Sequence, residues 1–225
     1  MGVVEAGAQS GVMALKIAVD ARPLSVLCLG AHSDDLEIGA GATLLTLASR
    51  FDSLSIQWVV MSAVGERAAE AHHGAELFVP KADIQVHEFP DARFPMHLDA
   101  LKDVFVELGR ELQPDLIFTH AEHDRHQDHR VVNQLTWQTF RDHLILEYEV
   151  PKFDGDLITP NFYFEIEAEV AQAKVRHLEE AFGSQTPKPW FDSATFRGLM
   201  RIRGNECRAA SGLAEGFHVR KAVIA

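Results

Sequence analysis

The sequence predicts an α/β fold, a single domain in which helices cover both faces of a doubly wound, mostly parallel sheet. Short, almost wholly apolar runs occur at 24–29 and 116–119, and such runs are typical of strands buried on both faces. Strand-like runs alternate with segments of helical spacing as far as about Asp142. This alternation predicts parallel strands, because each helical crossover returns the chain to the same end of the sheet.

Each element follows from a local pattern. The segment 54–61 is rich in β-branched and aromatic residues, and 84–89 alternates as a strand with one wet face does. Across 97–112 apolar residues recur at helical spacing, and Pro114 follows the predicted helix end. Strands are expected over 24–29, 54–61, 84–89, 116–119, 145–150, 161–166 and 217–224. Helices are expected over 42–49, 66–78, 97–112, about 124–142, 170–182 and 193–203, which gives a Rossmann-like arrangement.

Composition narrows the class of protein. The 225 residues, 47% of them apolar, suffice for one substantial core, and we divide them into a lead-in over 1–23 and a domain over 24–225. A net charge of −12 argues against binding to nucleic acid phosphates. Cys28 and Cys207 lie far apart, so no disulfide framework is implied and a reducing compartment is expected.

The sequence predicts a cytoplasmic protein without membrane insertion. No stretch approaches the roughly 18–20 apolar residues that a membrane helix needs. The first residues carry neither a basic leader nor an apolar run of the kind found in signal peptides. The oligomeric state is left open, and a homo-oligomer is compatible with the sequence.

A first polar cluster directly follows the first predicted strand. In LSVLCLGAHSDDLEIGAG, the apolar run ends in a glycine-flanked turn that carries His32, Asp34 and Asp35. Charged groups beside a low-dielectric core are costly unless they are paired or coordinate a ligand. In open α/β sheets the ligand crevice lies at the carboxyl ends of the strands, which is where these residues fall. A solvated loop with an aspartate N-cap is the alternative interpretation.

A second polar cluster, at 120–129, has the same position relative to the strand 116–119. His126 and His129 are three residues apart, so on a helix that opens near Asp124 they share one face. Asp128 lies between them and could orient an imidazole through one ring N–H. Two clusters at the carboxyl ends of parallel strands can face each other across one crevice.

Together the clusters suit a catalytic zinc ion. Such sites commonly take three ligands from His and Asp/Glu side chains and leave one position open for water. His32, Asp35 and His129 can supply these ligands, with Asp34 as a general base and His126 beside the developing charge. Fe²⁺ or Co²⁺ would in principle be accepted as well. A dinucleotide site is excluded, because the first turn lacks G-x-G-x-x-G and its carboxylates would repel pyrophosphate.

Three motifs carry a resemblance to a known family. AHSDDLEIGAG resembles the AHPDD-x-x-x-G motif of the LmbE-like/PIG-L family of zinc-dependent N-deacetylases, and HDRHQDHRVV resembles its D-x-H-P-D-H motif. SAVGERAAEA is similar to the Gly-Glu…Arg segment of that family, and weaker similarity extends to LAEGF near 217. Ser33 and Gln127 stand where the family usually has proline, and neither position carries a chemical group of the site.

The resemblance implies roles for seven residues. His32, Asp35 and His129 correspond to the zinc ligands of the family, and Asp34 corresponds to the base that activates water against an amide. His126 would stabilise the oxyanion and protonate the leaving amine. The remaining two correspond to a residue that tunes His126 and to a substrate-contacting arginine, namely Asp128 and Arg67.

The expected activity is removal of an N-acyl group, most simply acetyl, from an amino sugar or its conjugate. Two alternatives stay open, an amidase acting on a larger thiol-sugar conjugate and a non-catalytic metal-binding module on the same scaffold. His120 and His123 are expected in a solvated loop. Phe153 is expected in the core, although loops in its region could cover a sugar.

Overall fold

The computed structural model describes residues 23–51 and 53–223, so the predicted lead-in lies outside the described residues except for Pro23. The strands are β1 (Leu24–His32), β2 (Leu54–Ser62), β3 (Asp83–Val86), β4 (Leu116–His120), β5 (Leu144–Tyr148), β6 (Phe162–Glu165) and β7 (Ala214–His218). The α-helices are α1 (Asp35–Arg50), α2 (Glu66–Phe78), α3 (Leu98–Glu111), α4 (Gln127–Thr139), α5 (Ala168–Ala181) and α6 (Ser193–Cys207). Short 3₁₀ turns are η1 (Phe94–His97) and η2 (Gly183–Gln185).

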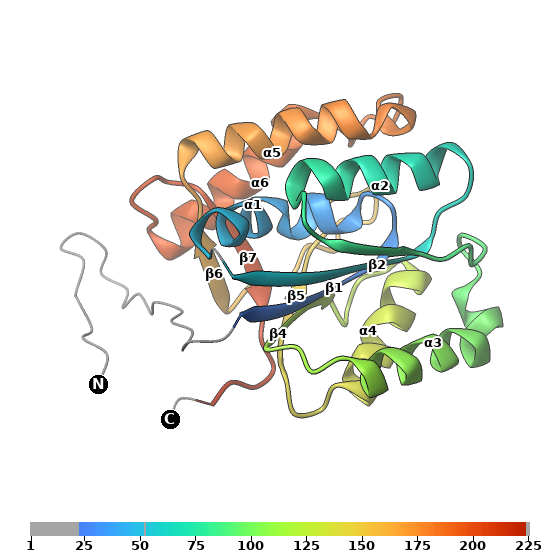
Figure 1. Ribbon diagram of the computed structural model, residues 1–225. Coiled ribbons are helices and arrows are strands. Elements are labelled where there is room, and N and C mark those ends of the chain that lie inside the picture. The colour runs from blue at the N-terminus through green and yellow to red at the C-terminus, as the bar shows by residue number, and fades with distance from the viewer. Residues whose placement is uncertain (1–22, 52, 224–225) are drawn as a thin grey trace.

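The strands form one seven-stranded sheet in the order β3-β2-β1-β4-β5-β7-β6. The first five strands in that order are parallel, and β7 and β6 are antiparallel to their neighbours. Helices α1, α2, α5 and α6 lie on one face of the sheet, and α3 and α4 cover the other (Figure 1). The prediction of a doubly wound, mostly parallel sheet between helical layers is confirmed.

The residues of β1 explain why the sheet lies between two cores. Val26 and Cys28 point to the face that carries α1, whereas Leu27 and Leu29 point to the face that carries α3 and α4. All four side chains are buried, as expected for a central parallel strand. Cys28 is therefore a small hydrophobic residue of the core, and its thiol is free.

Strand pairing explains why the two polar clusters meet. β1 pairs with β4 through Val26 and Leu116, although α1, β2, α2, β3 and α3 separate these strands along the chain. The strand order changes direction at this pair, and their carboxyl ends open at the same edge of the sheet. Such a switch point is where open α/β sheets bind ligands.

Some boundaries differ from the prediction. The helix expected from about Asp124 begins only at Gln127, because the His126 backbone N–H donates to Asp124 Oδ1 at 2.7 Å and His126 is extended (φ −68°, ψ 121°). The last strand starts earlier than expected, at Ala214. Within the described part of the chain, no helix combines the length and apolar character that a membrane crossing requires.

A buried ion pair fixes the middle of α1, whose first turn carries the first cluster. Lys174 Nζ donates to Ile38 O at 2.5 Å and to Glu215 at 2.6 Å. Glu215 in turn accepts the backbone N–H groups of Ala42 and Thr43 at 3.0 and 2.7 Å. Since both charged groups are buried and hydrogen-bonded, the pair ties α1 to α5 and β7 at a defined position.

Candidate metal centre and active site

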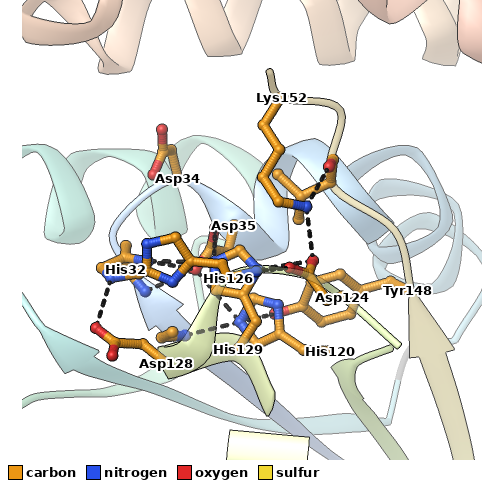
Figure 2. Close-up of polar contacts among 12 residues, drawn as sticks. His32, Asp34, Asp35, His120, Asp124, His126, Asp128, His129, Tyr148 and Lys152 are labelled. Carbon is orange, nitrogen blue, oxygen red and sulfur yellow. Dashed lines mark hydrogen bonds and ion pairs between the residues drawn. The ribbon is translucent and has the colours of Figure 1, made fainter. Parts of the chain in front are cut away.

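Three side chains from three elements converge at the carboxyl ends of β1 and β4 (Figure 2). His32 Nδ1 lies 3.3 Å from His129 Nε2 and 3.3 Å from Asp35 Oδ2, and His129 Nε2 lies 3.4 Å from Asp35 Oδ1. His32 ends β1, Asp35 opens α1, and His129 lies in the first turn of α4. The two predicted clusters therefore meet in one triangle of side chains, in which His32 and His129 face different oxygens of the Asp35 carboxylate.

The triangle fits a small divalent cation. Ligand atoms bound to zinc at about 2.0–2.1 Å in a tetrahedron lie about 3.3–3.4 Å from one another, which matches the observed separations. The described residues also contain three groups with metal-binding geometry: His32, His126 and His129; Asp35, His120 and His129; and His32, Asp91 and Asp128. Each of these groups includes His32 or His129. The site can therefore hold a metal ion on histidine and aspartate ligands.

The contacts of His129 select the tautomer that a metal ligand needs. Its Nδ1 donates to Asp124 Oδ2 at 2.9 Å, which leaves the lone pair of Nε2 directed into the triangle. Asp124 is buried, and its Oδ2 also accepts a hydrogen bond from Lys152 Nζ at 2.9 Å. Although burial opposes ionisation, the hydrogen bond from His129 and the nearby positive charges hold the pKa of Asp124 well below its usual value. The sequence analysis did not single out Asp124.

The other ring nitrogen of His32 faces two carboxylates. His32 Nε2 lies 2.9 Å from Asp91 and 3.4 Å from Asp128, which favours a proton on Nε2 and a free lone pair on Nδ1. The hydrogen bond with His32 lowers the pKa of Asp91 to about 2. Although burial opposes the charged imidazolium, Asp35 and the other nearby carboxylates raise the pKa of both His32 and His129, so the site favours positive charge between these side chains.

Asp128 has a different neighbour from the one that the sequence suggested. Its carboxylate accepts the backbone N–H groups of Ala92 and Phe94 at 2.7 and 3.1 Å and approaches His32 rather than forming a hydrogen bond with His126. Asp128 therefore anchors the segment before η1 beside His32. Its effect on His126 is electrostatic and opposes the lowering of that residue's pKa.

His126 occupies the N-cap position of α4, at the rim of the triangle, and is half-buried. Its ring centroid lies 4.9 Å from that of His32 and 4.6 Å from that of His129. Burial and the neighbouring histidines lower the pKa of His126, and its Nδ1 has no hydrogen-bond partner among the described residues. The imidazole is thus held beside the candidate ligands with hydrogen-bonding capacity to spare.

Asp34 lies next to the triangle and is paired with Arg67. The two side chains are 2.7 Å apart, and Arg67 also donates to the buried Glu70 at 2.9 Å. Glu70 accepts both the backbone N–H and the hydroxyl of Ser184 at 2.7 Å, which joins α2 to η2. Burial raises the pKa of Asp34, and the positive charge of Arg67 opposes the rise.

His120 corrects the prediction of a solvated loop. It is fully buried as the last residue of β4, and its ring stacks on that of His129 with centroids 3.8 Å apart. The Ala31 N–H donates to His120 Nε2 at 2.9 Å, and burial lowers the pKa of His120 to about 4. A neutral imidazole therefore backs His129, whereas His123 is exposed as predicted.

Comparison with known sequences decides the family. Residues 27–140 match the family described as PIG-L, GlcNAc-PI de-N-acetylase. The chain belongs to the PIG-L family. An uncharacterized deacetylase from Escherichia coli K12, YaiS, is 30% identical over 139 residues, which cover 56% of this chain and 74% of YaiS. The matched region contains both polar clusters, and the family is one of deacetylases, that is, amidohydrolases.

Solved structures of low sequence identity share the fold of this PIG-L protein. One is an N,N'-diacetylchitobiose deacetylase from Pyrococcus horikoshii, with a TM-score of 0.61, 20% identity and coverage of 86% of this chain and 82% of that one. Another is GalB, a 4-carboxy-2-hydroxymuconate hydratase from Pseudomonas putida KT2440, with a TM-score of 0.68, 17% identity and coverage of 90% and 98%. Since one scaffold carries two reactions, the reaction has to be argued from the site.

Proposed function

We propose that this protein is a zinc-dependent N-deacetylase that removes an acetyl group from an amino sugar or an amino-sugar conjugate. The observation that carries the proposal is the triangle of His32 Nδ1, Asp35 and His129 Nε2, with edges of 3.3–3.4 Å. These three residues would hold the metal ion. When bound, zinc supplies Lewis-acid polarisation of a carbonyl and makes water more acidic.

The side chains around the triangle supply the proton transfers that amide hydrolysis needs. Asp34 is a carboxylate beside the ligands and takes the proton from the attacking water, while Arg67 favours its ionised form and orients it. His126 stabilises the oxyanion of the tetrahedral species and delivers a proton to the leaving amine. The nitrogen of the amide leaves as the free amine, and the acyl group leaves as acetate.

An amino-sugar substrate is supported by the names of the relatives. The matched family is described by de-N-acetylation of GlcNAc-PI, and the Pyrococcus structure is a deacetylase of N,N'-diacetylchitobiose. Both are acetamido sugars, in which the scissile amide is linear and flanked by ring hydroxyls. Arg67 and Ser184, joined through Glu70, offer polar hydrogen-bonding groups to such a ring on the side of Asp34.

The proposal is tested by measuring metal content and amine release on the same preparation. Protein purified without added metal should carry about one equivalent of metal and release amine from a panel of N-acetylglucosamine glycosides, and a chelator should abolish the release. Failure to bind metal even after reconstitution would contradict the ligand assignment. Metal binding without amine release from sugars or from larger thiol-sugar amides would favour the non-catalytic module.

A further inference from the structure

Exposed apolar side chains occur on several segments that follow strand ends of the parallel sheet. Among the described residues, several large apolar side chains are exposed on the segments that follow the carboxyl ends of β2, β3 and β5. They are Val64, Met96, Leu98, Phe153 and Leu157. These segments leave the sheet at the carboxyl ends of its parallel strands, as the candidate metal centre does, and aromatic or apolar side chains beside such a crevice can contact a ligand. Phe153, at 75% exposure, is the largest of them and contradicts the prediction of a core position.

The segment that carries Phe153 is fastened to the second polar cluster. Lys152 lies 2.9 Å from Asp124 and 2.7 Å from Asp156, and Figure 2 shows Lys152 reaching Asp124 from this segment. Asp156 accepts the backbone N–H of Arg125 at 2.6 Å. Both flanks of Phe153 are therefore attached to residues 124–125, next to His126.

A buried ion pair fixes the far side of the same segment. The Ile158 N–H donates to Glu149 at 3.2 Å, and Arg203 donates to Ile158 O at 3.0 Å. Arg203 and Glu149 are both buried and 2.7 Å apart, so this anchor joins the segment to α6. Gly155 has a positive φ of 60°, which allows the chain to turn between Lys152 and Asp156. Phe153 is thus presented to solvent on an ordered frame.

We propose that Phe153 is a specificity-determining residue that packs against an apolar face of the substrate on the side of the leaving amine. The inference rests on the proposed function, because His126 is assigned to that amine and the Phe153 segment is bound to the residues just before His126. A pre-ordered aromatic ring loses little conformational entropy when it contacts a ligand. The apolar face is either the C–H face of the sugar ring or an apolar group linked to the sugar.

The test compares two probes on the zinc-loaded enzyme, the methyl and the octyl glycosides of N-acetylglucosamine. Phe153→Ala should raise KM about tenfold and leave kcat within about twofold, because the contact is made equally in the ground state and the transition state. An increase for both glycosides identifies the ring face as the contact, and an increase for the octyl glycoside alone identifies the linked group. Phe153→Tyr should retain the wild-type KM.

A matched control is Ile202→Ala, which removes another exposed apolar side chain, on α6, and should change neither constant. Unchanged KM for both glycosides in Phe153→Ala would overturn the proposal. Loss of self-association in that variant, with unchanged KM, would overturn it too and assign the face to contact between copies.

Calorimetry of binding to the deacetylated product, the octyl glycoside of glucosamine, separates this proposal from the proposed function. Suppose that the wild-type protein binds the product, that Phe153→Ala raises the Kd about tenfold, and that no amide is hydrolysed. The deacetylase assignment then fails and the Phe153 contact stands. If amides are hydrolysed and the product binds both proteins equally, the Phe153 contact fails alone. If the wild-type protein neither binds the product nor hydrolyses either glycoside, both fail.

Discussion

The two loops that meet at the candidate metal centre are built in opposite ways. Between β1 and α1 the chain turns within Ser33 and Asp34, both of which are buried. Between β4 and α4 it runs over 121–126 and alternates buried with exposed residues. The first loop is short, so the path of its backbone largely sets where its functional groups lie, and Arg67 of α2 pairs with Asp34. The second loop depends on several side chains from other elements.

The supports of the second loop show this dependence. Asp124 accepts hydrogen bonds from His129 and Lys152, and Arg130 donates to Asp124 O at 2.9 Å. At the first loop, the His32 N–H donates to Asp35 Oδ2 at 2.7 Å across only three residues, and Arg67 of α2 pairs with Asp34 at 2.7 Å. We therefore expect substitutions in the first loop to change catalysis directly. Substitutions of the residues that support the second loop should reduce metal affinity in smaller steps.

The largest effect should come from removing a ligand that lies beside either loop. If the residues that flank both loops bind one metal ion, His32→Ala and His129→Ala should each be purified with almost no metal and lack activity. His123→Ala removes an exposed imidazole of the second loop and should keep about one equivalent. Metal content by mass spectrometry checks this, and stoichiometric zinc in His129→Ala would refute its assignment as a ligand.

Asp34 should separate chemistry from metal binding. Asp34→Asn can still accept a hydrogen bond from Arg67 but cannot take a proton, so kcat should fall by about 10²–10⁴ while metal content stays near one equivalent. Glu66→Gln makes the same chemical change at an exposed position of the next helix start and should leave kcat unchanged. Full activity of Asp34→Asn in steady-state assays would eliminate Asp34 as the base.

The difference between the two loops also explains which site residues can be predicted from the sequence. His32, Asp34 and Asp35 lie within one short motif, so composition and position beside a strand suffice to find them. The sequence predicts only that the strands before the two clusters are parallel, which allows the clusters to share one crevice; the pairing of β1 with β4 is what brings His129 to that place.

The supporting carboxylates were harder to assign. Asp124 and Asp128 lie on either side of His126 in the sequence, and only the backbone path before α4 decides that Asp124 supports His129 and Asp128 faces His32. Lys152 comes from the segment after β5, and no local pattern links it to the second loop. Contacts of this kind depend on tertiary packing, which single-sequence periodicity does not report.

Asp124 should have an intermediate effect. Asp124→Asn weakens the acceptor that orients His129, so metal affinity should fall about 10–100-fold while the fold is kept. Asp154→Asn removes the same charge from an exposed neighbour of the Phe153 segment and should leave the affinity unchanged. Competition with a chelator of known affinity measures the difference. Equal affinities for Asp124→Asn and the wild type would show that the second loop does not need this support.

The smallest effect should come from Ser33, in the first loop. Its side chain is fully buried, and Oγ has no hydrogen-bond partner among the described residues, which is unfavourable. Ser33→Pro removes the hydroxyl and restricts the unfolded chain, which stabilises compatible positions by about 0.4–1 kcal/mol. His32 before it is already extended as the last residue of β1, the conformation favoured before proline.

We therefore expect Ser33→Pro to raise the unfolding temperature by about 2–4 °C per kcal/mol gained and to change metal affinity less than about twofold. Ser33→Ala removes the hydroxyl without restricting the backbone, so the difference in unfolding temperature between the two variants measures the effect of restricting the backbone. Thermal unfolding with and without zinc measures both quantities. If Ser33→Pro lost metal affinity while Ser33→Ala kept it, the turn would need a backbone that proline forbids. The short backbone path of the first loop would then not be sufficient to place its functional groups.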